Sequence, residues 1–159
     1  MDLVVNEWLP EYFKPDASNE EKQALERFLV CFSKKGYKMV VKKSSPFITK
    51  IFRYAKNFQH SADVVSPIRN FIKYVLMDSD RCMLVEEESG QDLPQNVSQK
   101  LSTGNFGSDR YLFEAASFIH NPEKIIITTD ARLKDHFKGD SWCRIILLND
   151  FLENYCNDI

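Results

Sequence analysis

The chain has 159 residues, of which 43% are hydrophobic, 13% aromatic and 28% charged, and its formal net charge is −2. This length and composition are typical of one globular domain with a sizeable core, and they exclude a disordered or fibrous protein. No apolar run approaches the roughly 20 residues of a membrane span, and the amino terminus lacks a signal-peptide pattern. We therefore expect one domain, residues 1–159, in a cytoplasmic protein that does not enter a membrane.

The four cysteines are far apart in the sequence, and none belongs to a C-x-x-C pair. They are Cys31, Cys82, Cys143 and Cys156. Zinc sites usually need closely spaced ligand pairs, so the cysteines give no sign of one. In a cytoplasmic protein we expect four reduced, mostly buried thiols.

The first half of the chain alternates short apolar strands with helices. Ser18 and Glu21 form a capping box at the start of a long helix, and Gly36 suits its end. Ser45 and Ser66 each precede a proline, a pattern typical of helix starts. The predicted elements are strands at 3–5, 37–41 and 82–85, and helices at 8–13, 18–35, 46–58 and 67–77.

The second half begins with a polar stretch, residues 87–107, that has no apolar period and predicts a long loop insertion. A helix is then predicted from Ser108, a strand at 125–129, a short helix at 131–137 and a last strand at 144–148, with Asn149 capping a final helix. Strands that alternate with helices indicate a mainly parallel central sheet covered on both faces. The predicted fold class is therefore α/β, a three-layer α/β/α sandwich.

Two acidic residues are candidates for chemistry. Asp130 follows the most apolar predicted strand, and Asp109 lies in the first turn of the preceding helix. Ligands of parallel sheets bind at the carboxyl ends of strands, where both acids could meet. Two or three carboxylates suffice for Mg²⁺ or Mn²⁺, which can promote phosphodiester cleavage. The alternative is that both acids only stabilise helix amino termini.

A basic segment suggests a surface for nucleic acid. Residues 34–56 contain eight lysines and arginines and no acid, with aromatic residues between them. Such a segment could bind phosphates while aromatic rings stack on unpaired bases, and a solvated helix face over an aromatic core is the alternative. The nucleic-acid candidates are Lys42, Lys43, Lys50, Arg53 and Thr128. Thr128 could contact a phosphate through its hydroxyl, and the equally good alternative is that a threonine stands there for its β-propensity and for helix capping.

Several segments, in order, resemble a PIN-like domain, the fold of many small metal-dependent ribonucleases and of toxins from toxin–antitoxin pairs. The matching segments are residues 3–9, 40–51, 108–116, 126–133 and 145–152. The resemblance implies an acidic ligand at Asp109, another at Asp130 in a Thr-x-Asp ending, and Mg²⁺ or Mn²⁺ as cofactor. It also implies an RNA substrate and a protein partner such as an antitoxin, or a second copy of the chain in a homodimer.

The chain departs from the family pattern at two positions. Asn6 stands where the first strand of the family usually ends in an Asp, and Lys50 stands where a Glu is usual. Asn6 can offer its carbonyl oxygen to a metal, and Glu7 can replace the lost charge. The expected metal ligands are therefore Asn6, Asp109 and Asp130, with Glu7 joining the two aspartates in catalysis.

Two functions follow from this reading. The first is a metal-dependent endoribonuclease, and the second is a catalytically inactive PIN-like module that binds RNA or protein, which the Asn6 and Lys50 departures favour. A nucleotide-binding or receiver-like domain is less suitable, because no glycine-rich phosphate loop follows the first strand.

Overall fold

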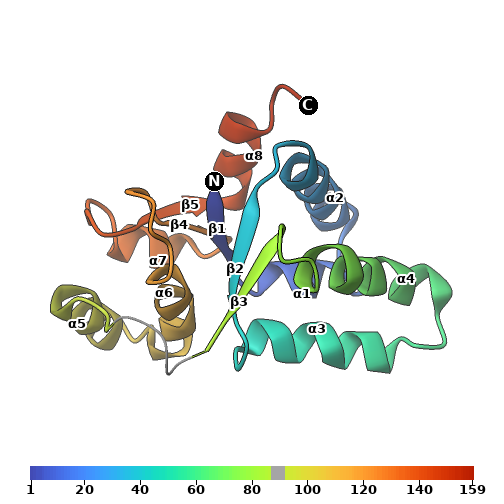
Figure 1. Ribbon diagram of the computed structural model, residues 1–159, viewed down its shortest axis with the longest axis horizontal. Coiled ribbons are helices and arrows are strands. Elements are labelled where there is room, and N and C mark those ends of the chain that lie inside the picture. The colour runs from blue at the N-terminus through green and yellow to red at the C-terminus, as the bar shows by residue number, and fades with distance from the viewer. Residues whose placement is uncertain (87–91) are drawn as a thin grey trace.

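The computed structural model describes residues 1–86 and 92–159 and has a five-stranded, all-parallel sheet at its centre (Figure 1). The strand order is β3-β2-β1-β4-β5. The strands are β1 (Asp2–Val5), β2 (Lys38–Lys42), β3 (Cys82–Val85), β4 (Ile125–Thr128) and β5 (Arg144–Leu147).

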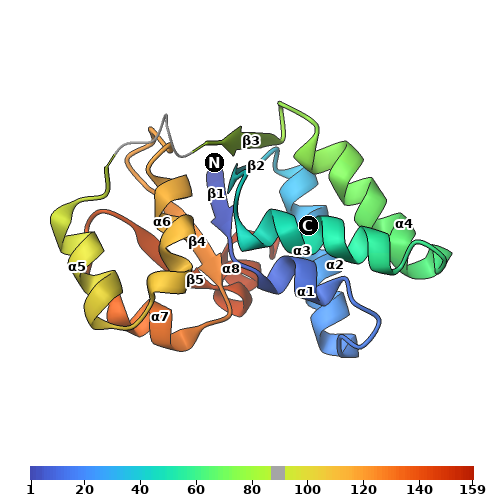
Figure 2. The ribbon, with the colours of Figure 1, turned by 90° about the horizontal axis from the view of Figure 1, so that it is seen from below.

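Helices cover both faces of this sheet, which confirms the three-layer α/β/α fold. Those of the first half of the chain, α1 to α4, lie on one side, and α5, α6 and α7 lie on the other (Figures 1 and 2). The last helix, α8, packs against α2 as well as β4 and β5. The α-helices are α1 (Trp8–Tyr12), α2 (Asn19–Lys34), α3 (Pro46–Asn57), α4 (Ala62–Phe71), α5 (Gln95–Thr103), α6 (Arg110–Ala116), α7 (Ala131–His136) and α8 (Leu148–Tyr155). Two short irregular helices are η1 (Ile72–Leu76) and η3 (Gly107–Asp109).

The central strands are apolar because they are buried on both faces. Leu3 of β1 pairs with Ile125 of β4, and Val5 pairs with Ile127. β4 is buried along its whole length, as expected for a strand covered by helices on both sides. This packing fixes the register of β1 against β4 and with it the position of the residues that follow each strand.

Several predicted helix ends are confirmed. The side chain of Ser18 accepts from the backbone N–H of Glu21, whose carboxylate accepts from the backbone of Ser18, so the capping box forms as predicted. Ser45 caps α3 by accepting from the N–H of Ile48. Gly36 ends the α2 segment with φ of +66°, a left-handed conformation that glycine adopts without strain.

Three predicted elements were wrong in extent. The fourth helix begins at Ala62, so Pro67 lies inside it and not at its start. The predicted loop at 87–107 contains α5, which buries Val97 and Leu101 on one face, whereas residues 87–91 lie outside the described part of the chain. The last helix begins at Leu148, two residues earlier than a cap at Asn149 predicts, and Asn149 does not cap it.

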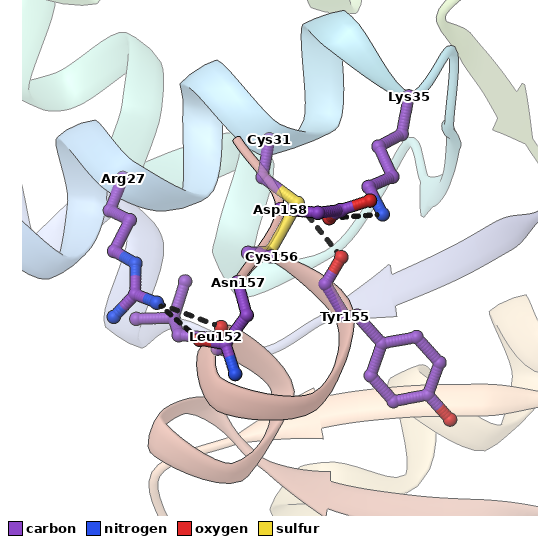
Figure 3. The surroundings of a disulfide bond; sticks show 8 residues. All are labelled: Arg27, Cys31, Lys35, Leu152, Tyr155, Cys156, Asn157 and Asp158. Atoms are coloured by element: carbon purple, nitrogen blue, oxygen red, sulfur yellow. Dashed lines mark hydrogen bonds and ion pairs between the residues drawn. A yellow bond between two sulfur atoms is a disulfide. The ribbon is translucent and has the colours of Figure 1, made fainter.

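The expectation of four reduced thiols was also wrong. Cys31 of α2 and Cys156, just after α8, form a disulfide (Figure 3). Lys35 and Asp158 form an ion pair of 2.8 Å beside it, and Arg27 donates to the carbonyl oxygen of Leu152. The end of the chain is thus tied to α2 covalently and by polar contacts.

None of the helices within residues 1–86 and 92–159 is long and apolar enough to cross a membrane.

Candidate functional site at the carboxyl ends of β1 and β4

The connections of the sheet diverge between the carboxyl ends of β1 and β4, and this edge of the sheet is called the crevice below. The chain leaves β1 into α1 and α2 on one face of the sheet, and it leaves β4 into α7 on the other (Figure 2). Open parallel sheets bind ligands where neighbouring connections diverge in this way. Asn6 and Glu7 follow β1, and Asp130 follows β4 by two residues. The residues predicted to carry chemistry therefore lie at the position that the topology favours.

Asn6 joins the two strand ends. Its Nδ2 donates to Oγ1 of Thr128 at 2.9 Å, and its backbone N–H donates to the carbonyl oxygen of Ile127 at 3.0 Å. Oδ1 of Asn6 accepts from the backbone N–H of Glu7 at 2.7 Å and lies 3.2 Å from the hydroxyl of Tyr111. The oxygen that was predicted to bind a metal is engaged in these contacts, which favour a positioning role for Asn6.

Glu7 is held by a residue from each face of the sheet. The hydroxyl of Tyr111, in α6, lies 3.1 Å from Oε2 of Glu7, and Nζ of Lys50, in α3, lies 3.0 Å from Oε1. Burial raises the pKa of Tyr111, and the nearby Glu7 carboxylate raises it further, so its hydroxyl keeps its proton and can donate. Glu7 therefore has a fixed orientation at the rim of the crevice.

Lys50 also binds Glu11, one helical turn beyond Glu7. Its Nζ lies 2.7 Å from Oε1 of Glu11, and the hydroxyl of Tyr54 donates to the same oxygen at 2.6 Å. Burial acts to raise the pKa of Glu11, but the hydrogen bonds from Lys50 and Tyr54 and the charge of Lys50 bring it below its usual value. Burial and the Glu11 carboxylate raise the pKa of Tyr54 to about 12.

Asp109 lies on the α6 side of the crevice. It is the residue before α6, but its side chain makes no capping hydrogen bond there. Its pKa is raised, first by burial and then by the negative charges of Asp130 and Glu7. The charges of Asp130 and Glu7 thus act on Asp109, whereas a shared site of the two aspartates stays a prediction.

Asp130 has the structural role that was considered as the alternative. Its Oδ1 accepts from the backbone N–H groups of Arg132 and Leu133 and so caps α7. The N–H of Asp130 donates to Oγ1 of Thr128 at 3.1 Å. Because both capping bonds use Oδ1, the cap orients the carboxylate without occupying Oδ2, to which no described residue is hydrogen-bonded.

The carboxylates of Asp109 and Asp130 are candidate ligands for a hard divalent cation that would take its other ligands from water or phosphate. Within the described ranges, no three His, Cys, Asp or Glu side chains are arranged as a metal site. Mg²⁺ and related ions, however, are often bound by one or two carboxylates and complete their coordination with water and phosphate oxygens. Burial and then the charges of Asp130 and Glu7 raise the pKa of Asp109, and a bound cation would offset this effect. By their chemistry Asp109 and Asp130 are the candidate ligands of such an ion.

Two of the predicted nucleic-acid contacts are inaccessible. Lys42 is only 5% exposed and lies 2.9 Å from Oε2 of Glu114, because β2 ends beneath α6. Thr128 is fully buried, and its hydroxyl is used by Asn6 and Asp130. The predictions that Lys42 and Thr128 bind nucleic acid are therefore wrong, because both side chains are buried and cannot reach a phosphate.

The remaining basic candidates lie at the surface or at the rim. Lys43 is exposed and lies 2.9 Å from Oε1 of Glu86, and Lys50 is engaged with Glu7 and Glu11. Arg53 is exposed on α3, one turn beyond Lys50, and its neighbour Phe52 has an exposed ring. Among these candidates, Arg53 on α3 is therefore the side chain most open to a ligand.

Sequence reasoning missed three residues of this network, namely Glu11, Tyr54 and Tyr111. Glu11 and Tyr54 could have been found from their spacing in the sequence. Glu11 is four residues from Glu7 and Tyr54 is four residues from Lys50, and residues at this spacing share a helix face. Tyr111 carried no such signal, since its contact with Glu7 arises only from the packing of α6 on β1.

Comparison of the chain with protein-family models, with curated proteins and with solved structures gave no significant match.

Proposed function

We propose that this chain is a PIN-like, metal-dependent endoribonuclease whose active site lies between β1 and β4. The observation that carries the proposal is the position of Asp109 at the ligand-binding edge of the sheet, where burial and then the charges of Asp130 and Glu7 raise its pKa. Clusters of partly buried like charges are costly to keep unless a counter-charge binds them. A divalent cation meets that requirement, and its remaining coordination positions can take the oxygen of a phosphodiester.

Each residue then has a distinct task. Asp109 and Asp130 hold Mg²⁺ or Mn²⁺, which when bound neutralises phosphate charge and lowers the pKa of water. The α7 cap fixes the direction of Asp130, and Tyr111 fixes the carboxylate of Glu7 beside Asp109. Glu7 is the proposed acceptor of a proton from the attacking water, because it is the carboxylate held in one orientation at the end of β1.

RNA approaches over the outer face of α3 in this proposal. Arg53 supplies a cation for the phosphate backbone, and the exposed ring of Phe52 offers a stacking surface for an unpaired base. A single-stranded substrate fits these two contacts better than a duplex, whose bases are already stacked. An antitoxin and a second copy of the chain remain predictions from the family resemblance, as does a toxin role.

The second candidate is a PIN-like module without catalysis that binds RNA or protein. The ion pairs of Lys50 favour it, because they neutralise Glu7 and Glu11 from within the chain. In that case the carboxylates stabilise the packing of α1 on α3, and nucleic acid binds α3 without being cleaved.

One experiment separates the two candidates. The chain is incubated with mixed single-stranded RNA and DNA in Mn²⁺, beside Asp130→Asn, in which asparagine retains the ability to cap α7. The nuclease predicts RNA cleavage by the wild type and its loss in the variant. Equal cleavage by both proteins would place the activity elsewhere. Salt-sensitive RNA binding without cleavage, weakened by Arg53→Gln, would support the inactive module.

A further inference from the structure

Lys50 lies between two carboxylates as a counter-ion built into the chain. Its Nζ is 3.0 Å from Oε1 of Glu7 and 2.7 Å from Oε1 of Glu11. The exposed fractions of the three side chains are 27% for Lys50, 27% for Glu7 and 34% for Glu11. Both ion pairs are therefore only partly screened by water, and they hold the ammonium where α1 packs on α3 (Figure 2).

The polar surroundings keep this arrangement charged. Tyr54 donates to the same oxygen of Glu11 that contacts Lys50, and Lys14 lies 3.5 Å from the other oxygen. Burial acts to lower the pKa of Lys50, but the hydrogen bonds that its ammonium donates to Glu11 and Glu7 bring it above its usual value. Lys50 is therefore a permanent cation next to the crevice.

The charges at the crevice divide into two pairs. Glu7 and Glu11 form one pair, with the ammonium of Lys50 between them, whereas Asp109 and Asp130, the ligands in the proposed function, form no ion pair with a described residue. An ammonium supplies positive charge and hydrogen-bond donors, but it has no empty coordination position for water or phosphate. Lys50 can thus compensate the charge of its pair without acting as a Lewis acid.

We propose that Lys50 takes the place of a second divalent cation and limits the crevice to one ion, held by Asp109 and Asp130. This inference rests on the proposed function, because it assumes that the aspartate pair binds a cation. Lys50 is a positioning residue here, since it acts through the carboxylates of Glu7 and Glu11.

The test is the number of Mn²⁺ ions bound by the full chain without RNA, measured by titration calorimetry and by the electron paramagnetic resonance signal of free Mn²⁺. We expect one ion for the wild type and two for Lys50→Gln, because the freed Glu7 and Glu11 become ligands. Lys50→Met should also bind two, and Lys50→Arg, which keeps the charge, should bind one. Lys35→Gln is the matched control, since Lys35 is equally buried and ion-paired with Asp158 at the far end of α2; it should bind one.

Thermal unfolding of each variant establishes that it is folded before the ions are counted. The same stoichiometry in Lys50→Gln, Lys50→Met and the wild type would overturn the inference, as would two ions in the wild type. One ion in the neutral variants and none in the wild type would overturn the proposed function, because Asp109 and Asp130 would then hold no cation. The same result would still support Lys50 as the replacement of a cation at Glu7 and Glu11.

Discussion

The hydroxyl of Tyr111 lies 3.1 Å from Oε2 of Glu7 and links α6 to the end of β1. Asp109 precedes Tyr111 by two residues, so the same contact fixes the start of α6 relative to the strand. The relative position of Glu7 and Asp109 therefore depends on a tyrosine that has no predicted chemical role of its own.

Tyr111→Phe should lower the free energy of unfolding by about 1 to 2 kcal/mol, because a buried hydroxyl loses a hydrogen bond to a charged group that water can still reach. Urea denaturation measures this change. Tyr74→Phe is the control, since Tyr74 is exposed, and its hydroxyl should contribute almost nothing. Equal stabilities of Tyr111→Phe and the wild type would show that the contact does not hold α6.

Asp109→Asn should make the metal-free protein more stable at neutral pH. Burial and the nearby carboxylates raise the pKa of Asp109 in the folded state. Its contribution to the free energy of unfolding is therefore fully present below the ordinary Asp pKa of about 3.9, and it is lost as the pH rises through the raised pKa. The advantage of the variant should therefore shrink as the pH falls toward about 4. Thermal unfolding in EDTA across this range measures it, with the exposed acid Asp135→Asn as control. A variant that is less stable than the wild type at neutral pH would contradict the like-charge repulsion.

Asn6→Asp tests whether Asn6 is a positioning residue. The change removes the N–H donor to Thr128 and adds a negative charge beside Glu7, so the metal-free protein should unfold at a lower temperature. Mn²⁺ should raise the unfolding temperature of Asn6→Asp more than that of the wild type, because the new carboxylate is a better ligand than an amide. Calorimetric scans with and without Mn²⁺ measure both effects, and an unchanged metal-free transition would argue against the contact with Thr128.

The disulfide should contribute about 2 to 5 kcal/mol to stability, since it closes a loop across a sequence separation of 125 residues. The double variant Cys31→Ser/Cys156→Ser should lose this amount in guanidinium unfolding. Denatured but unreduced wild type should release two titratable thiols, those of Cys82 and Cys143. Four thiols in that measurement would show that the bond does not form.

The fold was predictable because its signals are local. The strand at 125–129 was predicted to within one residue from its run of isoleucines, and the capping box of Ser18 marked the start of α2. The helix α5 was missed because its polar composition resembles a loop, although Val97 and Leu101 are spaced to share a face. Strand order could not be deduced, since no local signal says which strands lie side by side.

The site was predictable only in outline. Asp109 and Asp130 follow from the rule that ligands bind at strand carboxyl ends, and the charge of Asp130 acts on the pKa of Asp109. The ion pair of Lys50 with Glu7 could not be predicted, because it requires α1 to pack on α3. The burial of Lys42 could not be predicted either, because its partner Glu114 is distant in sequence and reaches it only through the packing of α6 on β2.

We propose above that Asp109 and Asp130 hold a cation for RNA cleavage. The most direct measurement is the Mn²⁺-dependent rate at which Asp109→Asn cleaves single-stranded RNA. Asp109 caps no helix, so this variant removes a ligand without removing a helix cap. We expect a folded variant whose rate falls by at least about a hundredfold, the usual effect of losing a group that stabilises charge in the transition state. A folded Asp109→Asn that cleaves RNA at the wild-type rate would contradict this proposal.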